Sequence, residues 1–406
     1  MKDNQAKYPQ LRFKGFTDPW EQRKLVSMAN YKNGKGHEDK QSTIGKFELI
    51  NLNSISISGG LKHSGKFIDE ADDTLQKDDL VMILSDVGHG DLLGRVALIP
   101  EDDRFVLNQR VALLRPNATA DPQFLFSYIN AHQYYFKAQG AGASQLNISK
   151  GSVENFISFV PIIEEQQKIG AFFKELDNTI ALHQRKLAKL KELKQGYLQK
   201  MFPKNGSKFP QLRFAGFADD WEVRKLGELS NIVGGGTPST SNPEYWDGDI
   251  DWYAPAEIGE QSYVSKSKKT ITELGLKRSS ARILPVGTVL FTSRAGIGNT
   301  AILAKEATTN QGFQSIVPVQ NKLDSYFIFS RTNELKRYGE VTGAGSTFVE
   351  VSGKQMSKMS IMVPELSEQQ KIGSFFKQLD DTIALHQRKL EKLQELKKGY
   401  LQKMFC

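Results

Sequence analysis

Apolar residues recur at intervals of mostly three, four or seven residues along one stretch in the middle of the chain, Glu165–Phe202. The apolar positions are Ile169, Phe173, Leu176, Ile180, Leu187, Leu190, Tyr197 and Met201. This spacing is close to that of a coiled-coil seam, so the pattern predicts one long helix. Two prolines, Pro161 and Pro203, flank the stretch and place helix breakers outside the pattern.

The stretch is repeated almost unchanged at the end of the chain, from Glu368 to Phe405. The two copies lie 203 residues apart and differ at six of 38 positions. A helix of this length spans roughly 57 Å at about 1.5 Å per residue, which is more than a globular core needs for cover. A single apolar stripe also fits an ordinary amphipathic core helix, but its repetition favours two long helices that pair with each other.

Each copy also carries two glycines, Gly170 and Gly196 in the first and Gly373 and Gly399 in the second. Glycine lowers the stability of a helix, because it gives up more backbone freedom than other residues when the helix forms. These positions therefore indicate either close packing or fraying helix ends.

A second repeat precedes each half of the chain. YPQLRFKGFTDPWEQRKL at Tyr8–Leu25 and FPQLRFAGFADDWEVRKL at Phe209–Leu226 are identical at 13 of 18 positions. Each repeat unit therefore runs from a lead segment through a middle region to a long helix, and two such units predict a pseudo-twofold fold. The predicted segments are residues 1–160, 161–203 (the first long helix), 204–363 and 364–406 (the second long helix).

The middle regions, Val26–Val160 and Gly227–Val363, match only in places but keep the same order of features. Each contains a strand-like run, a glycine turn and a second apolar run: LVMILSD then GRVALI in the first, TVLFTSR then AGIGNTAILA in the second. Such runs predict mixed sheets, with helices over Phe124–Phe136 and Tyr326–Tyr338. The expected fold class is α/β, more narrowly α+β, with two pseudo-symmetric domains and two long helices.

Two polar motifs recur in both middle regions. Asn108–Gln109 corresponds to Asn310–Gln311, and GAGAS at Gly140–Ser144 corresponds to GAGST at Gly343–Thr347. The nearly identical lead segments and helices indicate identical partners, whereas the diverged middle regions indicate different ones.

Composition narrows the class of protein. The 406 residues are enough for two or three domains, and a net charge of +8 supports an anionic partner without proving one. The single cysteine, Cys406, excludes an internal disulfide and a cysteine zinc cluster, and fits a reducing cytoplasm. The N-terminus has no signal-peptide core and no run of 18 apolar residues occurs, so we expect a soluble protein that is not exported.

Two short motifs imitate catalytic sites. GLKHSGK at Gly60–Lys66 has P-loop spacing, but Phe67 replaces the serine or threonine that binds magnesium, so a surface turn fits better. Asn242–Tyr245 resembles the tetrad of amino-methyltransferases, but glutamate replaces the second proline and no room is left for a nucleotide-binding half. No nucleophile elbow or His-Glu-x-x-His motif occurs, so catalysis is expected to belong to a partner, and no catalytic or metal-binding residue is assigned.

The chain resembles a specificity subunit of a Type I restriction-modification enzyme. The resemblance covers essentially the whole chain and rests on the paired EQQKIG and LDxTIALHQRKL helix motifs, the Asn-Gln features, and GGGTPSTSNPEYWDGDIDWY at Gly234–Tyr253. The first middle region departs most from the family pattern, because it lacks the glycine-threonine-proline segment.

The resemblance implies two target-recognition domains that each read one half of a split DNA site, separated by two helices packed as an antiparallel coiled coil. It also implies two adenine-specific methyltransferase subunits that dock near the helices and bind S-adenosylmethionine. Restriction subunits that use ATP and Mg would cut unmodified DNA in defence against foreign DNA. This chain would be a non-catalytic reader in the cytoplasm with no cofactor of its own.

Loop residues of the two middle regions are the candidate contacts to double-stranded DNA, with cations for phosphates and amide, hydroxyl and guanidinium groups for base edges. The candidates are Lys32, Lys35, Gln109, Arg110, Ser144 and Gln145 in the first domain and Thr237, Ser239, Arg294, Gln311, Ser346 and Thr347 in the second. Each of these side chains could instead cap a turn or lie in a solvated loop. A second function also fits the repeats: a two-lobed coiled-coil adapter that joins identical subunits and never touches bases.

Overall fold

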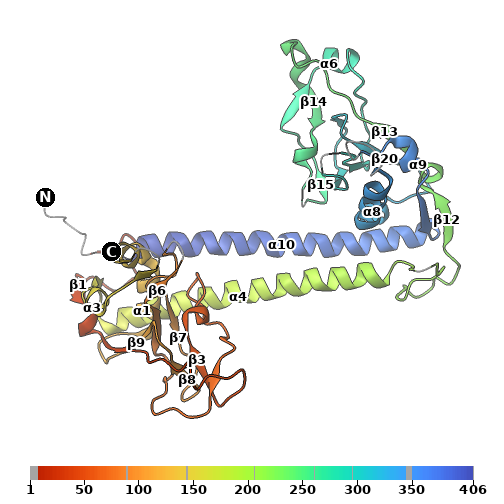
Figure 1. Cartoon of the computed structure of the whole chain (residues 1–406). Coiled ribbons are helices and arrows are strands. Elements are labelled where there is room, and N and C mark those ends of the chain that lie inside the picture. Colours follow the sequence, from red (N-terminus) through yellow and green to blue (C-terminus); the bar gives the residue numbers. More distant parts are fainter. Residues whose placement is uncertain are drawn as a thin grey trace. The chain divides into compact units, whose positions relative to one another are not determined.

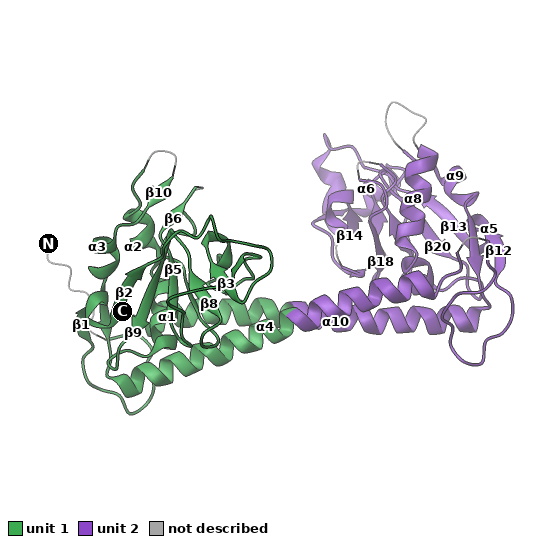
Figure 2. Ribbon diagram, turned by 60° about the horizontal axis from the view of Figure 1, so that its bottom comes forward, with its two compact units in different colours: residues 1–184, 388–406 green, residues 185–387 purple. Residues whose placement is uncertain are grey.

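The computed structural model describes residues 8–87, 90–142, 145–204, 206–259, 261–294, 296–343 and 350–405. The chain divides into two compact units, residues 1–184 with 388–406 and residues 185–387 (Figure 2). Each unit combines one sheet-containing domain with part of both long helices. Within the described ranges, no helix is both long and apolar enough to cross a membrane.

Two long helices carry the repeated motif, α4 (Ile163–Lys200) and α10 (Leu366–Met404) (Figure 1). They pair antiparallel, because within each unit the first half of one helix packs against the second half of the other. In the first unit the rings of Phe172 and Tyr400 lie 5.1 Å apart, and in the second the rings of Tyr197 and Phe375 lie 5.0 Å apart. The prediction of two long, paired helices is confirmed.

The contacts that pair the helices are the same in both units. All six positions at which the two copies of the motif differ are exposed in both helices, so every buried or half-buried position is identical. One ion pair illustrates the repetition. Lys397 Nζ lies 2.5 Å from Asp177 Oδ1 in the first unit, and Lys194 Nζ lies 2.5 Å from Asp380 Oδ1 in the second.

A buried ion pair ties each lead segment to the start of a long helix. Arg12 donates from Nε and Nη2 to both carboxylate oxygens of Glu165, at 2.7 Å each. The Glu165 side chain is fully buried, so water cannot replace the arginine. Arg213 and Glu368 repeat this geometry in the second unit, at 2.8 and 2.7 Å, and the Glu368 side chain is equally buried.

The lead segment also caps the C-terminal end of the other long helix in its unit with a backbone hydrogen bond. The backbone N–H of Leu11 donates to the carbonyl of Lys403 at 2.8 Å, and that of Leu212 donates to the carbonyl of Lys200 at 2.9 Å. Carbonyls in the last turn of a helix have no partner within the helix and need one from outside. Each lead segment therefore joins the start of one long helix to the end of the other.

Gly170 and Gly373 mark close contacts between a long helix and a sheet-containing domain. A Cβ at Gly170 would lie 2.4 Å from Oδ1 of Asp121, and one at Gly373 would lie 2.4 Å from Oδ1 of Asp324. Both aspartates cap the first turn of the helix that follows them, so neither can move freely. Close packing, one of the two explanations expected for the helical glycines, is confirmed at these two positions.

The first domain is built on a four-stranded antiparallel sheet in the order β2-β9-β5-β7, beside a mixed sheet in the order β4-β3-β8. The strands of these sheets are β2 (Ala29–Asn33), β3 (Phe47–Ile50), β4 (Phe67–Ile68), β5 (Leu80–Ile83), β7 (Val96–Leu98), β8 (Phe105–Leu107) and β9 (Val111–Pro116). Two strand pairs complete the domain: β1 (Glu21–Lys24) with β11 (Ile157–Val160), and β6 (Ser85–Asp86) with β10 (Leu146–Asn147). Its helices are η1 (Leu25–Ser27), η2 (Leu52–Ser54), α1 (Pro122–Ala131), α2 (Gln133–Ala138) and α3 (Lys150–Glu154).

The second domain repeats this arrangement with one additional strand in its main sheet, and its described residues form no counterpart of the β6–β10 pair. Its five-stranded sheet has the order β13-β20-β17-β18-β15, its mixed sheet has the order β16-β14-β19, and β12 pairs with β21. The strands are β12 (Glu222–Lys225), β13 (Ser230–Gly234), β14 (Trp246–Tyr253), β15 (Tyr263–Val264), β16 (Lys269–Ile271), β17 (Val289–Phe291), β18 (Thr300–Leu303), β19 (Thr308–Thr309), β20 (Gln314–Pro318) and β21 (Ser360–Val363). The helices are α5 (Leu226–Leu229), η3 (Pro243–Tyr245), η4 (Pro255–Glu257), α6 (Glu273–Lys277), α7 (Ser325–Phe329), α8 (Thr332–Gly343) and α9 (Gly353–Ser357). The expected α+β class with mixed sheets and one fold used twice is confirmed.

A phenylalanine from the end of a long helix completes the core of each unit. The ring of Phe405, just after α10, lies 5.7 Å from the ring of Phe124 in α1. In the second unit the ring of Phe202, just after α4, lies 5.7 Å from the ring of Phe327 in α7. The end of either long helix therefore packs on its domain in the same way.

The buried ion pair gives a stability prediction. Replacing Arg12→Ala leaves the fully buried Glu165 carboxylate without its partner, and losses of this kind amount to about 3–5 kcal/mol. Arg104→Ala is the control, because its pair with Glu101 is exposed and pairs of that kind contribute little. Denaturant unfolding of both variants should show a large loss for Arg12→Ala alone, and equal losses would contradict the assignment.

Candidate nucleic-acid interface

In the first domain two loops that are distant in sequence are locked together at one edge of the sheet. The N–H of Gly34, just after β2, donates to the carbonyl of Val111 at 2.9 Å, and Lys35 forms a β-bridge with Asn108. No larger residue fits at Gly34, because a Cβ there would lie 1.7 Å from the carbonyl oxygen of Asn108. The contact leaves Lys35 exposed beside the segment that leads into β9.

Gln109 and Arg110 lie exposed at the same edge. The side-chain amide of Gln109 donates to the carboxylate of Glu38, in the loop that follows β2. Arg110 has a φ of 66°, in the left-handed region that residues other than glycine rarely adopt. Its guanidinium forms no hydrogen bond or ion pair with the residues that the structure describes. The backbone thus holds a free cation next to an oriented amide.

Gln145 directly precedes β10, and the residue after β10 is linked to the segment before β9 by backbone hydrogen bonds. The carbonyl of Arg110 accepts from the N–H of Leu84, and the carbonyl of Leu84 accepts from the N–H of Ile148, both at 2.9 Å. The end of β10 and the loop before β9 are therefore joined through one residue, Leu84. Ser144 lies outside the described residues.

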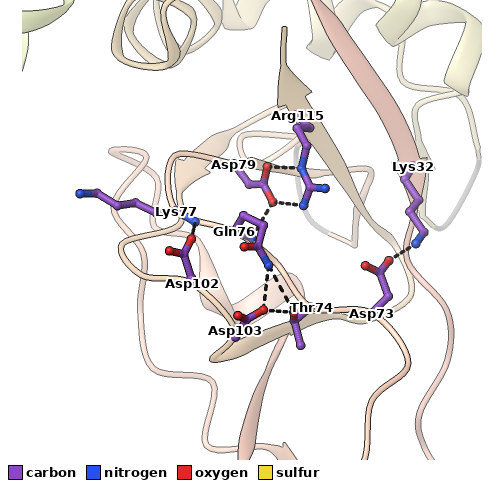
Figure 3. Close-up of polar contacts among 9 residues, drawn as sticks. All are labelled: Lys32, Asp73, Thr74, Gln76, Lys77, Asp79, Asp102, Asp103 and Arg115. Carbon is purple, nitrogen blue, oxygen red and sulfur yellow. Dashed lines mark hydrogen bonds and ion pairs between the residues drawn. The ribbon is translucent and has the colours of Figure 1, made fainter.

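Lys32 differs from the other cationic candidates of this domain, because its ammonium group pairs with the carboxylate of Asp73 (Figure 3). The loop that carries Asp73 is acidic and is held in place by further polar contacts. Arg115 donates to both carboxylate oxygens of Asp79 at 2.8 and 2.7 Å, and the backbone N–H of Lys77 donates to Asp102 at 2.7 Å. A DNA phosphate would have to compete with Asp73 for Lys32, so Lys32 is the weakest of the cationic candidates.

The second domain places Thr237, Asn310 and Gln311 in one hydrogen-bonded cluster. The side-chain amide of Asn310 donates to the hydroxyl oxygen of Thr237 at 3.0 Å, and that hydroxyl donates to the side-chain carbonyl of Gln311. The side-chain carbonyl of Asn310 also accepts from the N–H of Gly312 at 2.8 Å. The Gln311 amide group is therefore oriented, while its NH₂ group donates to no residue that the structure describes.

The glycine run before Thr237 is required by close backbone contacts. A Cβ at Gly235 would lie 2.0 Å from the carbonyl oxygen of Asn310, and one at Gly236 would lie 2.3 Å from the backbone nitrogen of Ala281. Arg294 lies near this cluster, since its Nε would be 3.5 Å from a Cβ built on Gly312. The Arg294 guanidinium forms no ion pair among the described residues, so it is free to bind an anion.

Two tryptophans bind the backbone of the Gly-Thr-Pro loop, residues 236–239, through their indole N–H groups. The indole N–H of Trp252 donates to the carbonyl of Gly236 at 2.8 Å, and that of Trp246 donates to the carbonyl of Ser239 at 3.2 Å. The two rings pack edge to face, with centroids 5.1 Å apart. The hydroxyl of Ser239 also lies 2.8 Å from that of Ser241, so Ser239 is positioned by the loop itself.

Asp251, next to Trp252 in β14, fixes the strand that carries these tryptophans. Burial alone would raise the pKa of Asp251, but hydrogen bonds from Ser267 and the ion pair with Lys305 outweigh burial, so the pKa lies below its ordinary value. Ser267 in turn accepts from the N–H of Trp252 at 3.0 Å. Ser346 and Thr347, the other candidates of this domain, lie outside the described residues.

The first domain has a structural counterpart of the Gly-Thr-Pro segment, although its sequence lacks the glycine-threonine-proline motif. Gly34 and Gly235 each lie directly after the equivalent edge strand, and each packs against the carbonyl of Asn108 or Asn310. The partner of the following glutamine differs, because Glu38 takes the place of Thr237. The one sequence signal for this correspondence is the near-equal separation of glycine and asparagine in the two domains.

The P-loop-like segment Gly60–Lys66 is a turn held by Glu48. The N–H of Ser64 donates to the Glu48 carboxylate at 2.5 Å, and Phe67 begins strand β4 rather than a helix. A carboxylate thus occupies the place where a phosphate would bind, which agrees with the interpretation as a surface turn.

Two domains of one fold thus each place at least one cation and an oriented amide at a loop edge, and each domain is joined to the paired helices. A family model described as "Type I restriction modification DNA specificity domain" matches residues 17–192 and 218–395. The chain belongs to this family. Its two sheet-containing domains are target-recognition domains, and the protein is a non-catalytic specificity subunit. The coiled-coil adapter that never touches bases has no support in this family.

Individual relatives agree with this assignment. A Type I restriction enzyme MjaIX specificity subunit of Methanocaldococcus jannaschii is 38% identical over 180 residues, which cover 44% of this chain and 42% of that relative. A putative type I restriction enzyme MjaX specificity subunit of the same organism is 24% identical and covers 94% of this chain and 91% of its own. A crystal structure of the Type-I restriction-modification S subunit from M. genitalium matches in fold, with a TM-score of 0.66 at 17% identity over 98% of this chain and 99% of its own.

The strained backbone at Arg110 gives a prediction that separates stability from DNA binding. Glycine adopts a positive φ without strain, so Arg110→Gly should leave the free energy of unfolding unchanged or raise it by up to about 1 kcal/mol. The same change removes a free cation and should weaken DNA binding about tenfold, with a shallower salt dependence. Asn321→Gly is the matched control, because Asn321 also has a positive φ, 64°, but lies outside the candidate loops.

Both quantities can be measured on the same preparations by denaturant unfolding and by salt-dependent DNA binding with the methyltransferase partner present. Full DNA affinity in Arg110→Gly, or an equal loss in Asn321→Gly, would remove Arg110 from the interface.

Proposed function

We propose that each target-recognition domain reads one half of a bipartite DNA site through the loops around Asn108–Gln109 and Asn310–Gln311. One observation carries this proposal. Each domain holds an equivalent glutamine at the corresponding edge of its own sheet, but the side chains around the glutamine differ between the domains. Gln109 is accompanied by Glu38, Lys35 and Arg110, whereas Gln311 is accompanied by Thr237 and Arg294. A common frame with different polar groups is what two different half-sites require.

The cations and the amides of these loops contribute differently to DNA binding. The exposed cations Lys35 and Arg110 and the half-buried Arg294 neutralise phosphates and supply affinity that falls with salt. The oriented amides of Gln109 and Gln311 match the hydrogen-bonding edge of adenine in the major groove, where a glutamine can bind with two bonds. Specificity is expected from the amides and from the side chains that orient them, Glu38 in one domain and Thr237 in the other.

The repeated scaffold supports two copies of one partner. Because lead segments and helices are nearly identical in both units, two adenine-specific methyltransferase subunits would dock on this chain and bring S-adenosylmethionine with them. Restriction subunits that use ATP and Mg would join the same complex in the cytoplasm and cut unmodified DNA. The two long helices, packed as a coiled coil, would set the distance between the half-sites.

Exchange of one domain tests the division of labour. Replacing residues 26–160 with the equivalent region of a relative should change one half of the methylated sequence and leave the other half and the spacing unchanged, because the scaffold is untouched. The reciprocal exchange of residues 227–363 is the control and should change the other half. Methylation mapping of a host that carries each hybrid with its methyltransferase gives the answer. Changes in both halves, or in neither, would contradict the proposal.

A half-length chain tests the pseudo-symmetry. Residues 1–202 include the Arg12–Glu165 pair, one complete domain and the whole of α4. The end of α4 can replace the end of α10 in the first unit, because the positions at which they differ are exposed and both copies of the motif end in Met-Phe. The fragment should therefore form a homodimer, since an interface between like elements can be rebuilt as an isologous one.

The homodimer should assemble more weakly than the intact chain, because the covalent link that raises the effective concentration is lost. It should still recruit two methyltransferase subunits and direct methylation to an interrupted palindrome of the first half-site. Sedimentation and methylation mapping check both points. A folded fragment that stays monomeric with its partner, or one that methylates a non-palindromic site, would show that the two units are not interchangeable.

A further inference from the structure

One segment has opposite charge in the two recognition domains. In the first domain it runs between β4 and β5, residues 69–79, and carries six acidic residues and one lysine, a net charge of −5. In the second domain it runs between β16 and β17, residues 272–288, and carries one acidic and three basic residues, a net charge of +2. The two segments are equivalent, because the strands that flank them hold the same places in their sheets.

In the first domain the acidic segment faces the cations beside the candidate DNA contacts. Asp72 and Asp73 line a cavity of about 80 Å³ together with Lys32 and Lys35. The ammonium group of Lys32 pairs with Asp73, as Figure 3 shows. One carboxylate thus takes the place that a DNA phosphate would need, and a second carboxylate lies beside it.

The chain holds Asp73 in position but binds its carboxylate only weakly. Directly after Asp73, the side chains of Thr74 and Gln76 donate to Asp103, which fixes the backbone. The side chains of Lys32 and Asp73 are 50% and 54% exposed. An exposed pair of this kind shifts an equilibrium by no more than about fivefold. A phosphate that base contacts hold in place can therefore displace Asp73 from Lys32.

In the second domain the equivalent segment brings cations to the corresponding loop. Its backbone packs against the Gly-Thr-Pro loop, because a Cβ at Gly236 would collide with the backbone nitrogen of Ala281. Lys277, Arg278 and Arg282 lie close to Ala281 in the chain and are exposed. They form no ion pair with the residues that the structure describes. The two domains therefore differ in charge beside the same part of the fold.

We propose that the complex holds DNA without a target through the second domain alone, and that the acidic segment of the first domain keeps that domain off such DNA. This inference rests on the proposed function. Lys277, Arg278 and Arg282 bind the phosphates of any duplex, whereas Asp72 and Asp73 repel them. The first domain then closes on DNA only where matching bases supply further contacts.

A duplex made only of G·C pairs tests this proposal, because it contains no adenine and hence no site for the expected methyltransferase. With that subunit present, the full chain with Asp72→Asn and Asp73→Asn should bind this duplex about threefold more tightly than the wild type, with a salt dependence steeper by about one counterion. The matched control is Asp219→Asn with Asp220→Asn. It removes the same charge from two adjacent aspartates of the lead segment, one of them in a comparably exposed pair with Lys208, and should bind like the wild type.

Amide hydrogen exchange on the same duplex shows which domain is bound. In the wild type, DNA should slow exchange in residues 235–239 and 277–282 and leave residues 34–38 unchanged. In the chain with Asp72→Asn and Asp73→Asn, residues 34–38 should be protected as well. On DNA that carries the target, both domains should be protected in either chain.

Two further variants test each domain separately. Asp73→Glu keeps the negative charge and should bind the G·C duplex like the wild type. Arg278→Gln with Arg282→Gln should bind it about tenfold more weakly, with a salt dependence shallower by about two counterions. All the replaced side chains are exposed, so thermal melting should show that every variant is folded.

The outcomes separate this inference from the proposed function. A wild-type complex that binds no duplex, with or without the target, overturns the proposed function and the inference with it. A complex that protects both domains on target DNA, and also protects residues 34–38 on the G·C duplex, overturns the inference alone. An equal gain in affinity in the Asp219 and Asp220 control does the same, because net charge would then explain the effect.

Discussion

Each unit buries one carboxylate, Glu165 or Glu368, and this burial constrains the lead segment and both long helices around it. A carboxylate with no exposed surface must be paired, and Arg12 or Arg213 of the lead segment supplies the partner through two hydrogen bonds of 2.7 to 2.8 Å. The same lead segments donate a backbone N–H to the last turn of the other long helix. One short segment thus fixes the start of one helix, the end of the other and the first strand of a recognition domain.

This rigid attachment explains how the recognition domains could diverge. The frame of each domain is set by backbone contacts, such as the packing of Gly34 or Gly235 against an asparagine carbonyl, which do not depend on the side chains that face a ligand. Glu38 and Thr237 can therefore orient the same glutamine with different chemistry. Under the proposed function, changes in these side chains would alter what is read without disturbing the helices, whose buried and half-buried positions are identical in both units.

The sequence predicts some of these features well and others hardly at all. The sequence predicts the long helices because their apolar spacing is local, and it predicts their pairing because the motif occurs twice almost unchanged. The contact of Gln109 with Glu38 spans 71 residues and depends on the pairing of β2 with β9, which no local pattern reveals. The sequence shows that Lys32 is a cation, but its pairing with Asp73 depends on the folded loop. The sequence shows the tryptophans next to the Gly-Thr-Pro loop, but their hydrogen bonds to the loop backbone can be seen only in the folded structure.

Amide hydrogen exchange of the chain with its methyltransferase, with and without DNA that carries the target, tests the central claim that two equivalent loop edges read DNA on an unchanging scaffold. The account predicts that DNA slows exchange in both domains at once, in residues 34–38 with 108–110 and in residues 235–239 with 310–312. It also predicts that exchange in α4 and α10 is the same in both states. Protection confined to one domain, or protection of the long helices with unchanged loops, would contradict it.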